Sequence, residues 1–167
     1  MGDHIPTSVG EATIERTAEG VRPVGEGWLV VNVADLAASG NPRMGITGSP
    51  EPTDHRFPEV GVNVRVLESG QFNARYHREN AQEAFLVLSG ECILIVEGEE
   101  RRLRSGDFFH SPPLTGHVFI GAGDRACTIL MVGGRTQEWC GSPKIAYADV
   151  PADEPARVPW PPAGIGC

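Results

Sequence analysis

Apolar and polar residues alternate along the middle of the chain, most clearly at residues 60–66, where valines are separated by Gly61, Asn63 and Arg65. A period of two residues is typical of a β-strand with one buried face. Glycine-bearing turns or a proline pair separate the strand-like segments that follow, at 72–79, 84–88, 91–97, 100–104, 107–111, 117–121 and 126–133. Short strands at this spacing, with no helices between them, predict an all-β sandwich or barrel.

The flanking segments are less regular. We expect a strand at 28–33, one short helix at 34–39 that is stopped by Gly40 and Pro42, and a loop at 43–58. The predicted organisation is an N-terminal arm at 1–27, a β-barrel domain at 28–134 with its core at 60–133, and an extended proline-rich tail at 135–167. The chain has no internal duplication, which predicts one barrel.

Composition narrows the classes of function. The chain has 167 residues, 40% of them apolar, which is enough for one domain with a real core. The net charge is −8, and the one basic cluster, at 101–104, lies next to two glutamates. We therefore expect no nucleic-acid or anionic-membrane partner. No apolar run reaches the ~20 residues of a membrane span, and no signal peptide is seen, so we expect a cytoplasmic protein.

The four cysteines are far apart in the sequence. Cys92 and Cys127 lie inside apolar strand-like segments, and we expect them to be small buried side chains in a reducing compartment. Cys140 and Cys167 could pair with each other, but nothing in the sequence requires it.

Candidate metal donors cluster around residue 80. On a strand, His77 and Glu79 point to the same face, and Glu83 follows four residues later, after a polar kink. His117 opens another strand after a proline turn. Two imidazoles and two carboxylates form a competent donor set for a divalent ion, although this spacing alone is a weak signal.

This segment resembles the first motif of the cupin family, G(X)5HXH(X)3–4E(X)6G. Glu83 followed after six residues by Gly90 reproduces its second half, and His77 stands at the position of the first histidine. Glu79 occupies the place of the second histidine, and six residues rather than five separate Gly70 from His77.

The second cupin motif, G(X)5PXG(X)2H(X)3N, is matched by Gly106, Pro112 and His117. Leu114 stands in the place of the turn glycine, and Gly121 in that of the final asparagine. The resemblance covers roughly residues 60–133 and implies a jelly-roll, double-stranded β-barrel with one divalent metal ion per chain.

The resemblance assigns His77, Glu79, Glu83 and His117 as metal ligands. The role of Glu79 is left open. It either binds the ion, or it pairs with Arg75 or Arg78 and the ion has three protein ligands. The carboxylate-rich set favours Fe²⁺ or Mn²⁺, with Zn²⁺ or Ni²⁺ as possible occupants.

Cupins host many reactions, so function rests on the site. The favoured hypothesis is a dioxygenase-like oxidoreductase that acts on a small organic molecule; the alternatives are a non-catalytic ligand-binding or sensor protein and a metal-dependent isomerase or lyase. Strand parity makes Arg75 the inward-facing cation, which could bind a carboxylate or enolate of the substrate or pair with a glutamate. His110 could be a general base or a buried polar residue. The expected pocket walls are Asn73, Arg75, Phe85 and Phe119. We expect a homodimer, with the arm lying across the neighbouring chain.

Overall fold

The computed structural model describes residues 8–135 and the strand at 145–147. Thirteen strands and one 3₁₀ turn are assigned: β1 Thr13–Thr17, β2 Gly20–Val24, η1 Val33–Asp35, β3 Ala38–Asn41, β4 Gly45–Gly48, β5 Val60–Leu67, β6 His77–Glu79, β7 Glu83–Ser89, β8 Glu91–Val96, β9 Glu99–Arg104, β10 Phe108–Ser111, β11 His117–Ala122, β12 Cys127–Gly134 and β13 Ile145–Tyr147.

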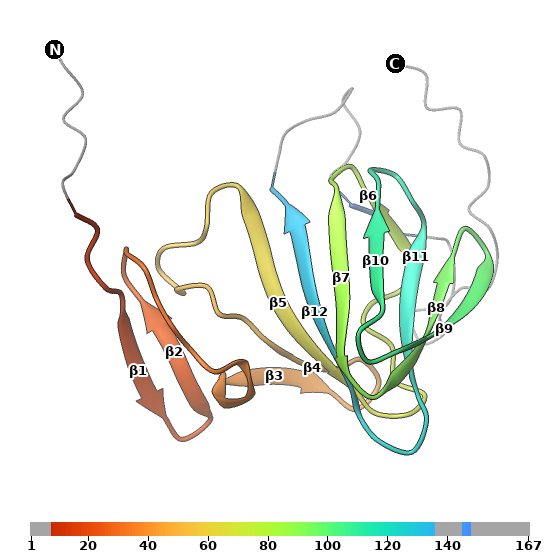
Figure 1. Ribbon diagram of the computed structural model, residues 1–167, viewed down its shortest axis with the longest axis horizontal. Helices are drawn as coiled ribbons and strands as arrows, with labels where there is room; N and C mark the ends of the chain where they lie inside the picture. Colours follow the sequence, from red (N-terminus) through yellow and green to blue (C-terminus); the bar gives the residue numbers. More distant parts are fainter. Residues whose placement is uncertain (1–7, 136–144, 148–167) are drawn as a thin grey trace, which may run out of the picture.

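Two antiparallel sheets form the jelly-roll barrel that the sequence predicts. One sheet has the order β10-β7-β12-β5-β4-β3, and the other has the order β13-β6-β11-β8-β9. Figure 1 shows the strands of the two sheets side by side around a common interior. The fold is therefore all-β, as expected, and no α-helix is assigned within residues 8–135.

The barrel interior next to the predicted ligands is apolar. Its core combines aliphatic, aromatic and sulfur-containing side chains from both sheets: Leu67, Phe85, Val87, Cys92, Leu94, Phe119, Cys127 and Ile129. The two cysteines in this cluster are free and fully buried, which confirms their expected role as small core side chains. Cys140 and Cys167 lie outside the described residues.

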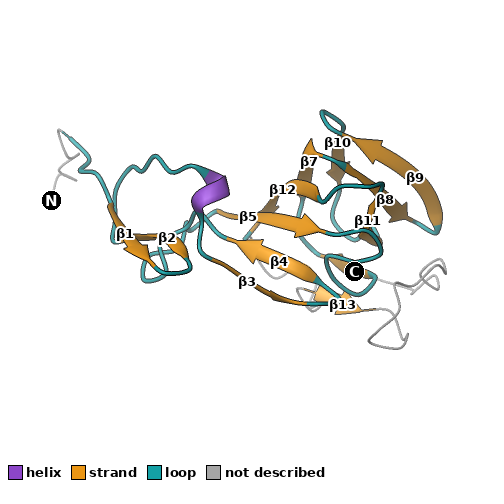
Figure 2. Cartoon of the chain, turned by 90° about the horizontal axis from the view of Figure 1, so that it is seen from below, coloured by secondary structure: helices purple, strands orange, loops and turns teal. Residues whose placement is uncertain are grey.

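The segment before residue 60 differs from the expectation. The predicted strand at 28–33 is absent, since only Trp28 forms a bridge there and a 3₁₀ turn begins at Val33. The predicted helix at 34–39 is also wrong, because β3 begins at Ala38 and pairs with β4, which lies in the expected loop. Residues of the predicted N-terminal arm form the β1–β2 hairpin, seen apart from the main sheets in Figures 1 and 2.

Strand β5 shows how the hairpin and the barrel are joined. Its buried valine, Val64, packs on the outside of the barrel against Val21 of β2 and Leu36. The alternate residues of β5 therefore point inward, and Leu67 belongs to the barrel core. The valine alternation is a true strand signal, but the valine face is the outer one.

No helix among the described residues has the length and apolar character needed to cross a membrane.

Candidate functional site

A cavity of about 310 Å³ lies between the two sheets at one end of the barrel. The six-stranded sheet contributes residues of β5, β7 and β12 to its walls, and the five-stranded sheet contributes residues of β6 and β11. All four predicted metal ligands line this cavity: His77, Glu79, Glu83 and His117. Residues that are up to 40 positions apart in the sequence are thus brought to one place.

The two histidines are neighbours on adjacent strands. His77 of β6 pairs in register with His117 of β11, and their ring centroids are 4.9 Å apart. Both side chains are buried, His117 completely. Phe85 of β7 meets the His117 ring edge-on at a centroid distance of 5.2 Å, which restricts its rotation.

Hydrogen bonds to the backbone fix the tautomer of each ring. His77 Nδ1 lies 2.8 Å from the carbonyl oxygen of Arg75, and His117 Nδ1 lies 3.0 Å from that of Thr115. Because a carbonyl oxygen can only accept, the proton of each neutral ring is on Nδ1. Nε2 of each ring then carries the lone pair that a metal ion would use.

Burial keeps both rings neutral. It lowers the pKa of His77 below the ordinary histidine value. The pKa of His117 is lowered to about 4, first by burial and then by the neighbouring His77. A neutral imidazole is the form that binds a divalent ion, so these shifts favour metal binding at neutral pH.

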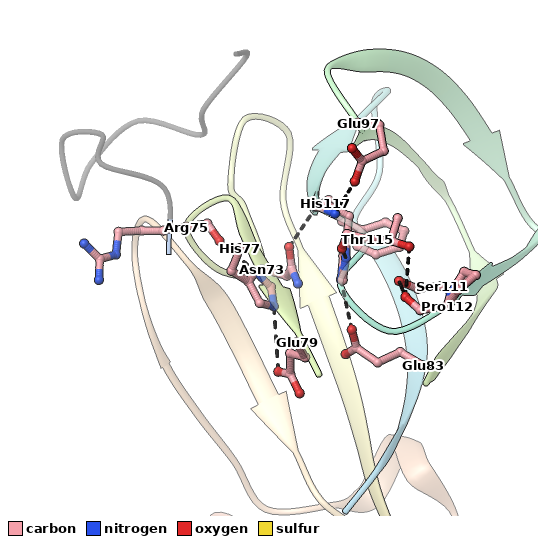
Figure 3. Close-up of polar contacts among 12 residues, drawn as sticks. Asn73, Arg75, His77, Glu79, Glu83, Glu97, Ser111, Pro112, Thr115 and His117 are labelled. Carbon is pink, nitrogen blue, oxygen red and sulfur yellow. Dashed lines mark hydrogen bonds and ion pairs between the residues drawn. The ribbon is translucent and has the colours of Figure 1, made fainter. Parts of the chain in front are cut away.

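The four donors fit a divalent ion by chemistry and, in part, by position. His77 Nε2 lies 3.9 Å from Glu79 Oε1, and His117 Nε2 lies 3.5 Å from Glu83 Oε2 (Figure 3). Two atoms bound to one tetrahedral ion at about 2.1 Å are separated by about 3.4 Å, so each pair has nearly the spacing of two ligands. Within residues 8–135 no three such side chains converge as a group that could hold an ion, so the two pairs must approach each other on binding.

One atom of this set stands out. Nε2 of His117 is fully buried and has no hydrogen-bond partner. An unsatisfied buried polar atom carries a free-energy cost, and a metal ion would remove it. This orphaned lone pair, aimed toward Glu83, is the strongest structural sign of a ligand.

Backbone contacts hold the loop before His117. Gly116 N donates to the Glu97 carboxylate in the β8–β9 turn, and Gly116 packs so closely on Tyr76 that a Cβ at this position would lie 2.6 Å from the phenol oxygen. Tyr76 is itself fully buried.

The predicted wall residues fall into two groups. Asn73 and Phe85 line the cavity, and Asn73 Oδ1 accepts a 2.8 Å hydrogen bond from Phe119 N. Phe119 lies deeper, in the apolar core. Arg75 is not among the lining residues, and its side chain points away from the histidines in Figure 3 because the chain bends before β6 and breaks the strand alternation.

His110 is also outside the cavity. It lies on β10, is exposed, and does not belong to the lining residues. The suggested general-base role of His110 has no geometric support in this arrangement, and neither does a role for Arg75 in binding a substrate.

Sequence reasoning missed the cations that do line the cavity. Arg65 points inward from β5, and Arg56 and Arg135 come from the segments before β5 and after β12. Arg65 could have been found from the alternation at 60–66, had the valine face been assigned to the outside of the barrel.

One protein family matches the central part of the chain. Residues 63–133 match the family model of the cupin domain. No curated protein matches the chain.

Solved structures share the fold at low sequence identity. The polyketide cyclase RemF from Streptomyces resistomycificus is 15% identical with a TM-score of 0.61, over 75% of this chain and 89% of that chain. A sugar phosphate isomerase of the cupin superfamily from Silicibacter pomeroyi is 21% identical with a TM-score of 0.56, over 73% and 83% of the two chains. A protein with a double-stranded β-helix domain from Klebsiella pneumoniae is 20% identical with a TM-score of 0.58, over 72% and 97%. At these identities the likeness is one of fold.

Proposed function

The chain contains a cupin domain over residues 63–133, and from this premise we propose that it is a metal-dependent oxidoreductase acting on a small organic molecule inside the barrel. One divalent ion per chain, Fe²⁺ or Mn²⁺ by preference, is held by His77, Glu79, Glu83 and His117. The buried, unpartnered Nε2 of His117 carries this proposal.

The donor set favours hard or borderline ions. Carboxylate oxygens and imidazole nitrogens suit iron and manganese, whereas a site built from thiolates would select zinc or copper(I). When bound, such an ion supplies Lewis-acid activation of a substrate oxygen and one-electron chemistry with dioxygen.

The residues of the chain position the reactants. The carbonyl oxygens of Arg75 and Thr115 hold the two imidazoles with Nε2 toward the cavity. Phe85 packs against His117 and keeps the inner end of the cavity apolar and dry. Asn73 lines the cavity and is held in place by the hydrogen bond that its Oδ1 accepts from Phe119 N, so its amide group can contact a bound molecule. In a dioxygenase reaction, both oxygen atoms of O₂ are added to the organic molecule held there, and no other reductant is consumed.

An isomerase reaction is less well supported. It requires a base beside the ion, and the residue that the sequence suggested for that role, His110, does not line the cavity. The metal-dependent oxidation therefore remains the proposal.

Metal analysis of the purified protein tests the first half of this proposal. We expect about one ion per chain in wild-type protein and in the His110→Ala variant, and loss of the ion in His117→Ala. His110 serves as the control because it is an exposed histidine of the same barrel. Full occupancy in His117→Ala, or no ion in the wild type after incubation with Fe²⁺ or Mn²⁺, would overturn the metal site.

Oxygen consumption tests the second half. The iron-loaded protein is mixed with phenolic, enolic and keto compounds under dioxygen, and uptake is compared with that of His117→Ala. Uptake by the wild type alone supports the oxidoreductase. Binding of these compounds without uptake would instead indicate a ligand-binding protein.

A further inference from the structure

Arg65 lies in the same cavity as the candidate metal ligands, on the opposite wall. It belongs to β5 in the six-stranded sheet, whereas the two histidines belong to β6 and β11 in the five-stranded sheet. Its neighbour on the same face, Asn63, also lines the cavity. A molecule held between these walls would therefore touch β5 at one end and the histidines at the other.

The guanidinium of Arg65 has few partners for a half-buried cation. Its Nη1 donates a 3.3 Å hydrogen bond to the carbonyl oxygen of Met44, and its Nε is buried with no acceptor. It forms no ion pair with any carboxylate of residues 8–135. Burial lowers the pKa of this arginine, which is the expected response of a cation that has lost solvent without gaining an anion.

The other arginines of the cavity are different. Arg135 forms a 2.6 Å ion pair with the buried Glu51 and also donates to the carbonyl oxygen of Phe57. It is therefore already satisfied and holds the loop before β5 in place. Arg56, from that loop, is exposed to solvent. Among the described residues that line this cavity, Arg65 is the half-buried cation whose guanidinium is short of acceptors.

A partly buried cation with no counter-ion, whose Nε is fully buried and lacks an acceptor, is costly, so its retention suggests that an anion is supplied by the ligand. We propose that Arg65 binds a carboxylate of the organic molecule that occupies the cavity, so that the substrates of this site are small monocarboxylic acids. The inference rests on the proposed function, because it assigns the substrate class of that same cavity.

Charge and shape both favour a monocarboxylate. Arg56 is exposed to solvent and Arg135 is neutralised by Glu51, so neither adds much charge to the interior of the cavity. Among the remaining groups, a bound divalent ion and Arg65 carry three positive charges, and Glu79 and Glu83 carry two negative ones. One carboxylate balances the remaining positive charge, whereas a phosphate dianion would leave an excess of negative charge. The planar fork of a guanidinium matches the two oxygens of a carboxylate, and a cavity of about 310 Å³ limits the ligand to a small molecule.

The test compares acids with their neutral primary amides. Benzoate, phenylacetate and cinnamate are each titrated against the corresponding amide into Mn²⁺-treated protein, with binding followed by ligand-observed NMR. We expect at least one acid to bind about tenfold more tightly than its amide, as for a charge-assisted hydrogen bond in a buried site. The Arg65→Met variant should lose this preference, and the control variant Arg125→Met, which changes an exposed arginine outside this cavity, should keep it.

Three results would overturn the inference: no preference for any acid in the wild type, a preference that survives in Arg65→Met, or tighter Arg65-dependent binding of phenyl phosphate than of every acid. Thermal unfolding checks that Arg65→Met is folded, and we expect its midpoint to be no lower than that of the wild type because a partly buried charge without a counter-ion is removed. If Arg65→Met does not fold, Arg65→Lys carries the test, since it keeps the charge but loses the fork and should reduce the preference.

Metal content measured on the same samples separates this inference from the proposed function. An Arg65-dependent preference for acids in protein that retains no ion would leave the inference standing and the metal site wrong. Retained Mn²⁺ without any preference for acids would leave the metal site standing and show that the inference about Arg65 is wrong.

Discussion

The backbone N–H of Leu114 donates a 2.6 Å hydrogen bond to the carbonyl oxygen of Glu79. This bond ties the proline turn before β11 to β6, and so connects the loop that leads to His117 with the strand that carries His77 and Glu79. The turn reaches this position with Leu114 in the left-handed region, at a φ of 72°. The geometry of the site thus depends on a backbone conformation that leucine adopts at a cost.

Leu114→Gly should therefore stabilise the protein. The left-handed conformation costs a residue with a Cβ about 1 kcal/mol or more, whereas glycine adopts it freely. The greater freedom of glycine in the unfolded chain offsets part of this gain. We expect the free energy of unfolding to rise by about 0.5 kcal/mol, measured by urea denaturation.

The control for this change is Thr115→Gly, at a neighbouring position without a positive φ. It should destabilise the protein, because glycine there increases the conformational entropy of the unfolded chain without relieving strain. It also removes the hydroxyl that donates to the Pro112 carbonyl oxygen. A loss of stability in Leu114→Gly similar to that in Thr115→Gly would contradict the strain at Leu114.

Gly121 also departs from the second cupin motif, but here a substitution toward the motif should destabilise the protein. A Cβ at Gly121 would lie 2.2 Å from the carbonyl oxygen of Glu68, which is backbone and cannot move aside cheaply. Gly121→Asn should lower the free energy of unfolding by about 3 kcal/mol or more, as severe overpacking does. Gly133→Ala is the matched control, since its Cβ would meet Glu83 at an ordinary 3.7 Å. Equal stability of Gly121→Asn and wild type would mean that the backbone at Glu68 moves to make room for the new side chain.

The sequence predicts the barrel strands well but not the strands before residue 60. Strands β5, β7, β8, β11 and β12 contain alternating or continuous apolar residues, and glycine-bearing or proline turns bound them, so their local sequence is enough to predict them. Strand β3 consists of Ala38–Asn41 and is fully exposed, so its own residues carry no strand signal. It is a strand because it pairs with β4, which in turn pairs with β5, and such tertiary pairing overrides local propensity.

The candidate site is predictable in its ligands but not in its walls. The two histidines and two glutamates follow from the spacing of the cupin motifs, and all four line one cavity. Strand parity failed for Arg75, because the bend before β6 interrupts the alternation. It also concealed Arg65, because the outer face of β5 is covered by Val21 and Leu36, and a covered outer face is as apolar as an inner one.

The stability of the metal-free protein should fall on acidification because His117 is buried and neutral. Its pKa of about 4 in the folded state lies below the ordinary value of 6.5, so the unfolded chain binds a proton first as the pH falls. The contribution is fully present above about pH 6.5 and is lost between 6.5 and 4, by up to about 3 kcal/mol. Urea denaturation of EDTA-treated protein at a series of pH values measures it.

Variants assign this pH dependence to the buried ring. His117→Gln should flatten the profile between pH 6.5 and 4.5, and His110→Gln, which changes an exposed histidine, should leave it unchanged. An unaltered slope in His117→Gln would place the effect on other groups.

Glu79 decides how many ligands the ion has. It replaces the second histidine of the motif, and its Oε1 lies 3.9 Å from His77 Nε2 in the cavity. If its carboxylate binds the ion, Glu79→Gln removes an anionic ligand of nearly the same shape and should weaken Mn²⁺ binding by about tenfold or more. Glu79→His should retain the ion, because it supplies the nitrogen donor that the motif normally has.

A metal titration of four proteins settles the assignment: wild type, Glu79→Gln, Glu79→His and Glu83→Gln. Glu83→Gln provides the scale, since Glu83 Oε2 is the carboxylate oxygen next to the orphaned Nε2 of His117. A loss of affinity in Glu79→Gln comparable to that in Glu83→Gln means that both carboxylates bind the ion. Unchanged affinity in Glu79→Gln, with a clear loss in Glu83→Gln, would reduce the site to His77, Glu83 and His117 and leave Glu79 to pair with Arg75 or Arg78. With only one anionic ligand, the metal centre itself would carry one more positive charge, and the iron-loaded protein should then have a higher reduction potential than a site that includes Glu79 as a ligand.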